Sequence, residues 1–502
     1  MYVYFSLDHW SVKKAGRKAA VQAFNYTGGA MKYLLVIVAL LEAVVTAAFS
    51  DNVDFQRLLL QQQQQQQDDN QGDIWAVLLA GSSGWFNYRH QADVCHAYQI
   101  LHQHGVPDDH IIVMMYDDIA HDVQNPTPGV IINRPGGPNV YEGVLKDYTG
   151  RDVTPENFLK VLSGDAESLR GVGSGKVLKS GPNDRVFINM VDHGAPGIFA
   201  FPNDYLNATD LVDAILAMHR ASRYSQMVMY VESCESGSLF KSLLPDDIKV
   251  YALSASAPNQ HSYACYEDDT LHTFLGDVFS VKWMEDTDVE NLKKETLKQQ
   301  YKLVRHEVVT STVMHWGELR LASQKLSRFL GNKDSHPNTS QLSVATDIEN
   351  LVNYPTISKW NDPCLNTSVA SDDVPVAILK SRVRSAASAL EKQHWKEALK
   401  SLLLNRVHVR SVMQSLVSEM TGNQVVTTMI TAKDHSHDIS RWDCYQDSVR
   451  TFHTHCFDLS QNTYALRVLK IIVNLCEHGY THQQFLEAAR VVCTHSSFTG
   501  II

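Results

Sequence analysis

Two side chains that could do covalent chemistry together follow two separate apolar runs. His193 comes after residues 186–191, and Cys234 comes shortly after residues 227–231. A thiol is a poor nucleophile until it is deprotonated, and a neighbouring imidazole supplies both the base and a stabilising positive charge. A cysteine at a strand end is usually inert packing, and a histidine there is usually a hydrogen-bonded polar residue. Because both stand in matching positions, the sequence favours Cys234 as a nucleophile and His193 as its base.

Gly194 bears on how such a nucleophile would work. Since glycine has no side chain, the backbone stays bare beside His193. The N–H groups of Gly194 and Cys234 could form an oxyanion hole, where the loss of one donor costs about 10²–10³ in rate. We therefore expect Gly194 to act through its main chain.

The runs that carry these residues are typical of buried strands. Short apolar runs occur at residues 74–80, 111–115, 185–191, 227–231 and 250–253. Helix-like segments lie between them: one opens at Thr154 with a cap and a proline, and another runs from Thr209 to about residue 223. Strands that alternate with helices predict a mostly parallel open sheet, whose ligand sites lie beyond the carboxyl ends of the strands. That edge would bring His193 and Cys234 within reach of each other.

The chain changes character after residue 331. A polar, proline-punctuated segment predicts an exposed connector, and from Ala377 onward apolar residues recur at helical spacing. The predicted parts are a leader (1–50), a polar polyglutamine linker (51–72), an α/β catalytic domain (73–331), a connector (332–376) and an all-α C-terminal domain (377–502).

The leader has the parts of a secretory signal. Met31 and Lys32 precede an apolar stretch that ends in small residues at Ala47 and Ala48. The uninterrupted apolar run is too short to span a bilayer, although a membrane anchor is the alternative. We expect the true start at Met31, with residues 1–30 an upstream extension or part of a long leader. Under either interpretation of residues 1–30, the leader would direct the protein into the secretory pathway.

Eight cysteines suit that oxidising compartment. Four of them crowd near the C-terminus: Cys444, Cys456, Cys476 and Cys493. They predict two disulfides with three pairings open, and the absence of a CxxC pair argues against zinc. Three sequons predict glycosylation, at Asn207, Asn338 and Asn366. The net charge of −11 argues against nucleic acid as a partner, and we predict no metal and no cofactor.

Longer segments around the candidate dyad point to a family. They are residues 87–93, 113–118, 125–129, 192–194, 232–238, 262–266 and 281–286, with 454–457 and 473–477 near the C-terminus. Together they resemble the legumains, the asparaginyl endopeptidases, over nearly all of residues 73–495. The resemblance implies a caspase-like fold and hydrolysis after asparagine, more weakly after aspartate at acid pH.

The resemblance also implies roles by position. Asn87 would orient His193, and Asp192 matches an aspartate that the family tends to convert to succinimide. The residues that would form the specificity pocket are Arg89, Glu232, Ser262 and Asp277. A carboxamide has an acceptor and an NH₂ donor, so an arginine and a carboxylate would satisfy both ends. Without the family match, Arg89 and Asp277 would read as a surface ion pair and Asn87 as a turn residue.

Further implications concern disulfides, partners and location. The family pairing would be Cys444–Cys476 and Cys456–Cys493. Partners would be protein and peptide substrates, the chain's own C-terminal domain as inhibitor, and cystatin-type inhibitors, with no membrane anchor in the mature form. The location would be a lysosome, an acidic vacuole or a gut-like lumen. We expect the C-terminal domain to cover the active site at neutral pH and to leave on acidification, as carboxylates lose charge.

Some positions depart from the family. His261 stands where relatives often carry serine, and Cys364 has no counterpart, whereas Cys95 and Cys265 match unpaired thiols. In relatives, the activating cut follows an asparagine close to the start of the helical domain, a stretch that residues 385–387 occupy here without an asparagine. The cut would then follow Asn353, Asn361 or another residue of the connector.

Three other functions compete with an asparagine-specific hydrolase. A transamidase that attaches lipid anchors should carry a C-terminal membrane segment, which residues 491–502 do not offer. A peptide ligase differs only in how water reaches the acyl-enzyme. A catalytically silent binding homologue is disfavoured by the presence of Cys234, His193 and Asn87.

Overall fold

The computed structural model describes residues 72–333, 362–432, 437–494 and 498–502. The predicted leader, the polyglutamine run, Asn338 and the first part of the connector lie outside these residues. Within them, no helix combines the length and apolar character needed to cross a membrane.

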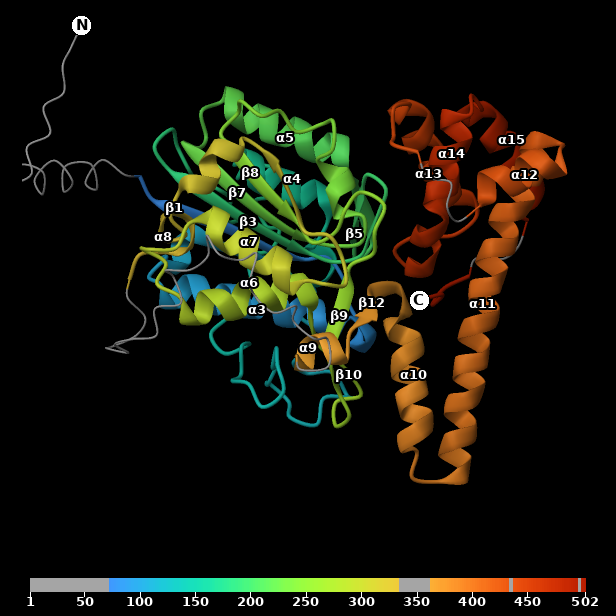
Figure 1. The fold of residues 1–502 in the computed structure, drawn as a ribbon, viewed down its shortest axis with the longest axis horizontal. Helices are drawn as coiled ribbons and strands as arrows, with labels where there is room; N and C mark the ends of the chain where they lie inside the picture. The colour runs from blue at the N-terminus through green and yellow to red at the C-terminus, as the bar shows by residue number, and fades with distance from the viewer. Residues whose placement is uncertain (1–71, 334–361, 433–436, 495–497) are drawn as a thin grey trace, which may run out of the picture. The chain divides into compact units, whose positions relative to one another are not determined.

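A six-stranded sheet forms the centre of the N-terminal part (Figure 1). Its order is β11-β8-β7-β3-β1-β2, and only the edge strand β11 runs antiparallel to its neighbour. The bounds are β1 Ile74–Ala80, β2 Ile111–Met114, β3 Arg185–Val191, β7 Gln226–Glu232, β8 Val250–Ser254 and β11 Met314–Gly317. The predicted mostly parallel sheet is confirmed. Its inner strands are buried on both faces, which is why they read as continuous apolar runs.

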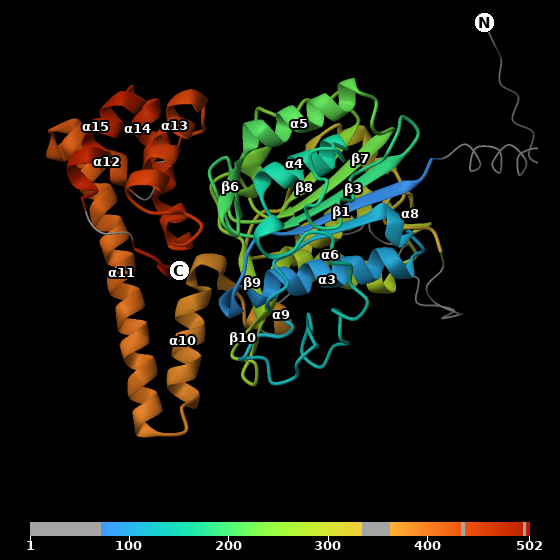
Figure 2. The ribbon, with the colours of Figure 1, turned by 180° about the vertical axis from the view of Figure 1, so that it is seen from behind.

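Helices cover both faces of this sheet (Figure 2). One face packs on α3 Tyr88–Gln103, α6 Val278–Val289 and α7 Leu297–Glu307, with the short α8 Ser327–Leu330 beside them. The other face packs on α4 Pro155–Ser163 and α5 Ala208–Arg220. As predicted, Thr154 caps α4, since its side chain accepts a hydrogen bond from the Asn157 N–H.

Two small sheets lie outside the central one. The first contains β4 Gly194–Ala195, β5 Ile198–Phe201 and β6 Asp204–Asn207. The second contains β9 Tyr263–Asp268, β10 Thr273–Asp277 and β12 Val369–Ala370. Because β12 belongs to the predicted connector, part of that segment is built into a sheet beside the catalytic core.

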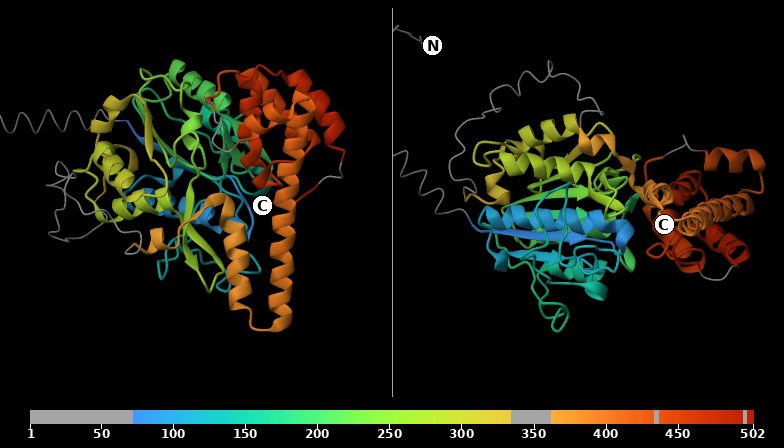
Figure 3. Two further views of the ribbon diagram at one scale, coloured as in Figure 1. Left: turned by 45° about the vertical axis from the view of Figure 1, so that its right-hand side comes forward. Right: turned by 90° about the horizontal axis from the view of Figure 1, so that it is seen from below.

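The C-terminal part is helical, as predicted. Its helices are α9 Pro363–Asn366, α10 Val374–Ser385, α11 Ala389–Thr421, α12 Gln424–Thr431, α13 Trp442–His455, α14 Leu469–Glu477 and α15 His482–Val492. Helices α10 and α11 lie side by side as a hairpin (Figure 3). The disulfides Cys444–Cys476 and Cys456–Cys493 are formed in the pairing that the family resemblance implied. These helices share a hydrophobic cluster with Ile198 and Ala200 of β5.

Two expectations about the connector were wrong. Its described C-terminal portion is packed rather than exposed, because Leu365, Ser371 and Val374 are buried against the catalytic part. Cys265 is not an unpaired thiol, since it forms a disulfide with Cys364, and the Cα atoms are 4.9 Å apart. Cys364 therefore fastens the connector to β9, a contact that side-chain polarity alone could not predict.

Candidate active site

His193 and Cys234 follow two neighbouring strands at the same edge of the sheet. Strands β3 and β7 run parallel, with Val191 opposite Glu232, and the N–H of Asp192 donates to the Glu232 carbonyl at 3.0 Å. Both dyad side chains are buried, with 7% of His193 and 2% of Cys234 exposed. The sheet topology thus brings the two predicted residues to one edge.

Asn87 determines how the His193 ring is oriented. Its Nδ2 donates to the Ser83 carbonyl at 2.9 Å, so its Oδ1 is left to face Nε2 of His193 at 2.8 Å. An amide oxygen only accepts, so Nε2 must carry the proton in this contact. The neutral ring then has Nδ1 free of a proton, as a general base requires.

The backbone at Gly194 lies against Cys234. A Cβ atom at this position would lie 2.8 Å from Ser233 Oγ and closer still to the Cys234 carbonyl oxygen. Since any side chain would clash there, glycine is required for the two main-chain segments to approach. This proximity is what an oxyanion hole made of the two N–H groups would need.

The predicted pocket residues are gathered and buried beside the dyad. Arg89 Nε donates to Asp277 Oδ1 at 2.9 Å, with both side chains 1% exposed. Glu232 Oε2 accepts hydrogen bonds from the N–H and hydroxyl of Ser280 at 2.9 and 3.1 Å. The arginine is therefore no surface ion pair but part of a buried charged cluster.

Three polar atoms of this cluster have no hydrogen-bond partner although they are buried. They are Arg89 Nη2, Glu232 Oε1 and Asp277 Oδ2. A buried unsatisfied polar group is costly unless a ligand satisfies it. One donor and two acceptors are the complement of a carboxamide, which offers one oxygen and one NH₂ group.

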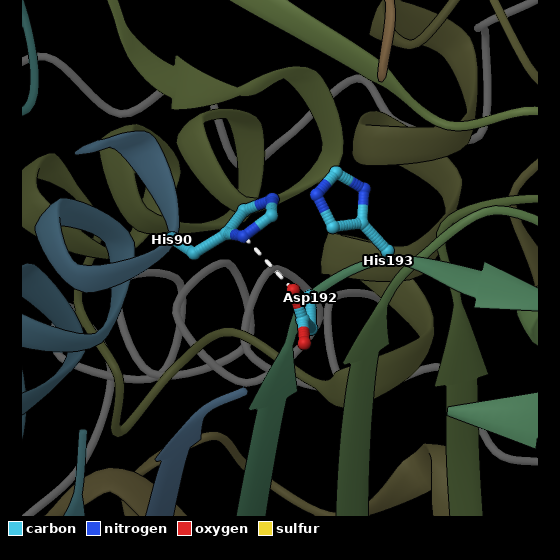
Figure 4. A group of neighbouring side chains, drawn as sticks. All are labelled: His90, Asp192 and His193. Carbon is cyan, nitrogen blue, oxygen red and sulfur yellow. Dashed lines mark ion pairs between the residues drawn. The ribbon is translucent and has the colours of Figure 1, made fainter. Parts of the chain in front are cut away.

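A second buried group lies behind the dyad and was not predicted. His90 Nδ1 is 3.1 Å from Asp192 Oδ1, and the His90 ring meets the His193 ring edge-on at 5.0 Å between centroids (Figure 4). Burial raises the pKa of Asp192 well above its ordinary value, although the His193 N–H and Arg89 oppose this. In the sequence, His90 directly follows the predicted pocket residue Arg89. That position could have indicated that His90 also lies near the active site.

The described end of the connector runs through the active site. We call residues 369–373 the strap. Its Val369 and Ala370 pair with Ala264 and Tyr263 of β9, and the Ser371 N–H donates to the Ser262 carbonyl at 3.0 Å. The Ser371 and Ser262 hydroxyls are 3.1 Å apart.

Asp372 of the strap places a carboxylate against the nucleophile. Its Oδ1 is 3.7 Å from Cys234 Sγ. Its Oδ2 pairs with His261 Nδ1 at 3.1 Å and with Arg467 Nη1 at 2.7 Å. The next residue, Asp373, pairs with Arg406 at 3.0 Å. Sequence reasoning missed both aspartates and both arginines, because their partners lie far away in the chain.

The pKa values of the dyad and of Asp372 are all shifted in this buried setting. Burial and, to a smaller extent, the charge of Arg89 lower the pKa of His193 to about 3. Burial, and then the charge of Asp372, raise the pKa of the Cys234 thiol well above its ordinary value. Burial alone would raise the pKa of Asp372, but the hydrogen bond and charge of His261, together with Arg467, hold it well below the usual range. Both dyad groups are therefore neutral beside an ionised carboxylate.

Two groups of metal-binding residue types occur among the described residues. They are His90–Asp192–His193 and Cys234–His261–Asp372, each with its candidate atoms within 4.8 Å of one another. The ion pairs already described account for the spacing of both groups, so we assign no metal to them.

Two sequons can be placed in the structure. Asn207 is the N-cap residue of α5, and its Nδ2 donates to Asp210 at 2.9 Å. Asn366 ends α9 and is exposed. Neither lies in the active site.

Comparison with known proteins gives the family. The model of the peptidase C13 family matches residues 74–332, and that of the legumain prodomain matches residues 397–493. The chain belongs to the peptidase C13 family. The first match covers both residues of the dyad and all four pocket residues, and the second covers helices α12 to α15.

Individual C13 relatives are similar over most of their length. Legumain from Mus musculus is 47% identical over 427 residues, covering 84% of this chain and 93% of the relative. Legumain from Homo sapiens is 44% identical, with 82% and 90% covered. The vacuolar-processing enzyme of Vicia sativa is 38% identical, with 84% and 86% covered. Among solved structures, caspase-1 from Spodoptera frugiperda aligns with a TM-score of 0.32 and 10% identity, over 53% of this chain and 93% of that one.

As a C13 member with a matching prodomain, the chain is a cysteine endopeptidase in precursor form. Cys234 and His193 are a thiol and an imidazole, the two groups that this chemistry uses, and both lie within the first match.

Proposed function

We propose that Cys234, His193 and the pocket of Arg89, Glu232 and Asp277 hydrolyse peptide bonds directly after asparagine. The observation that carries this specificity is the set of three buried atoms without partners. A substrate asparagine would accept from Arg89 Nη2 and donate its NH₂ hydrogens to Glu232 Oε1 and Asp277 Oδ2. Sites built on such hydrogen bonds reject a residue that cannot make them.

The reaction follows from the geometry of the dyad. His193 Nδ1 takes the Cys234 proton, and the thiolate attacks the backbone carbonyl carbon of the substrate asparagine. The N–H groups of Gly194 and Cys234 stabilise the oxyanion. His193 then protonates the leaving amine, and water hydrolyses the acyl-enzyme. Asn87 keeps the ring oriented throughout.

Weaker cleavage after aspartate at acid pH has a source in Glu232. Burial and the neighbouring Asp277 raise its pKa well above the ordinary value, so the pocket takes up a proton as pH falls. A protonated Glu232 donates instead of accepting, and a substrate carboxylate needs donors. The pocket can then accept aspartate.

The strap and the helical prodomain would keep the precursor inactive. Ser371 occupies the pocket entrance and Asp372 blocks Cys234, while Arg406 and Arg467 of the helical part hold both aspartates. We place the catalytic domain at residues 73–331, the connector at 332–376 and the prodomain at 377–502. The prodomain is thus the chain's own inhibitor, and cystatin-type inhibitors would compete for the same site.

Release on acidification would be driven by His193. In the closed precursor, burial and then Arg89 lower its pKa from about 6.5 for a free histidine to about 3, against the opposing charge of Asp372. Opening removes the part of this burial that the strap and the prodomain supply. A group with this shift favours the closed form above about pH 6.5, and that advantage is lost as pH falls toward 3. Asp372 does not contribute, because its lowered pKa keeps it charged, so our expectation that carboxylates lose charge is wrong for this residue.

A fluorogenic Ala-Ala-Asn substrate tests this function. The processed protein should cleave it at pH 5, and Cys234→Ala should abolish cleavage. The matched Ala-Ala-Gln substrate should be cut at least about 10²-fold more slowly, since its longer side chain misplaces the amide. Activity that survives the cysteine substitution would contradict the assignment.

The compartment follows from the same chemistry. A dyad released by acid would act in a lysosome, an acidic vacuole or a gut-like lumen, after entry through the secretory pathway. Glycosylation at Asn207, Asn338 and Asn366 and conversion of Asp192 to succinimide belong to this proposal.

A further inference from the structure

The strap lies in the active site in the register of a substrate. It extends the sheet at β9, and its Ser371 N–H binds the Ser262 carbonyl at 3.0 Å. The Ser371 hydroxyl is 3.1 Å from that of Ser262, one of the four predicted pocket residues. Ser371 thus stands where the substrate asparagine would stand.

Asp372 then stands where the first residue after the scissile bond would stand. It directly follows Ser371, and its side chain is 3.7 Å from Cys234 Sγ. The strap therefore shows what the enzyme presents to a side chain on the leaving-group side of the bond.

What faces that side chain is His261. Its Nδ1 is 3.1 Å from Asp372 Oδ2, and its side chain is 34% exposed, so it can be reached from solvent. The other partner of this oxygen, Arg467, lies in the prodomain match and leaves with the prodomain. His261 lies in the peptidase match and stays.

We propose that His261 makes the mature enzyme prefer an acidic residue immediately after the asparagine. This specificity rests on the proposed asparagine cleavage and adds to it a second position of the substrate. The imidazolium would pair with the incoming carboxylate as it now pairs with Asp372.

Other charged groups near His261 do not oppose this pairing at acid pH. Glu235 is an acid whose charge acts on His261, and burial in the closed precursor raises its pKa to about 8. Where it ionises in the mature enzyme, its charge also raises the pKa of His261 and keeps the imidazole protonated. Ser262 and Cys234 carry no charge there, and Arg467 is gone.

Two internally quenched peptides of the same length test the proposal. One contains Ala-Ala-Asn-Glu and the other the isosteric but neutral Ala-Ala-Asn-Gln, whose glutamine is not itself a cleavage site, and both are assayed with processed enzyme at pH 5. We expect kcat/KM for the acidic peptide to be about 3- to 5-fold higher, the size typical of a partly exposed ion pair. His261→Gln and His261→Ser should bring the ratio to about one.

The pH profile of the ratio gives a second readout. It should be largest between about pH 4.5 and 6, where glutamate is ionised and histidine protonated, and should fall toward one by about pH 8. A structural role for His261 would change both rates together and leave the ratio unmoved.

The outcomes separate this proposal from the one it rests on. A wild-type ratio of one at pH 5, or a ratio that persists in both His261 variants, overturns the role of His261. If the variants fail to fold, a wild-type ratio that stays constant from pH 5 to pH 8 overturns it. Failure to cut Ala-Ala-Asn-coumarin would instead contradict asparagine cleavage itself.

Discussion

The side-chain amide of Asn87 orients the imidazole ring of His193. Its Nδ2 is held by the Ser83 carbonyl, so only its oxygen can face the His193 ring. The ring can then present just one nitrogen to the thiol. The chemistry of Cys234 thus depends on a residue that does not touch it.

Asn87→Ala should therefore lower kcat with little change in KM. A base misplaced by about 1 Å costs on the order of 10²-fold in rate. Steady-state kinetics on processed enzyme with Ala-Ala-Asn-coumarin would measure this, with thermal unfolding as the control for folding. A larger effect on KM than on kcat would contradict an orienting role.

Glu232→Gln should shift specificity from asparagine toward aspartate. Because Ser280 donates to Oε2, the glutamine oxygen would stay there and its NH₂ would face the pocket. An acceptor for the substrate NH₂ is replaced by a donor, so the ratio of aspartate to asparagine cleavage should rise on the order of 10²-fold. The rise should no longer need acid pH. Paired Ala-Ala-Asn and Ala-Ala-Asp substrates at pH 5 and pH 7 measure it.

At the scale of elements, sequence patterns predicted strands better than the strap. Residues 185–191 and 227–231 are buried on both faces, so their apolar character revealed β3, β7 and the dyad at their ends. The strap is held by main-chain pairing to β9 and by ion pairs to Arg406 and Arg467. Main-chain pairing leaves little trace in residue types, and the arginines are distant in sequence, so a polar connector was predicted to be exposed.

Ser371→Asn should turn the strap into a substrate. The asparagine would enter the pocket that Ser371 now adjoins, with the 371–372 bond close to Cys234. We expect a new cut after residue 371 when the purified precursor is brought to pH 5, seen by intact mass spectrometry. The double variant with Cys234→Ala should remain uncut, and an uncut single variant would contradict the substrate register.

At the scale of the whole molecule, the helical part is joined to the catalytic part by packing as well as charge. The Tyr445 hydroxyl donates to the Pro196 carbonyl at 2.6 Å, and Ile198 and Ala200 belong to the helical hydrophobic cluster. Opening this interface would expose the buried dyad, so the titration of His193 is coupled to it.

The closed precursor should therefore lose stability as pH falls from 7 to 4.5. In the Cys234→Ala background, which prevents cleavage, the thermal midpoint of the helical part should drop over this range. Adding His193→Ala should make the drop smaller, because the group that gains a proton on opening is gone. His261 and Glu235 act in the opposite direction, since closure raises the pKa of both. An equal drop in both variants would show that His193 is not the sensor.

The Cys265–Cys364 disulfide gives the precursor a closed covalent ring, because it joins residues 99 positions apart. Asn353 and Asn361 lie inside this ring, whereas residues 385–387 lie outside it. Cutting a ring once opens it without dividing it. A precursor cut at either asparagine would thus remain one molecule, with strap and prodomain still attached, and would migrate as an intact chain in electrophoresis until a thiol reductant separated it into two.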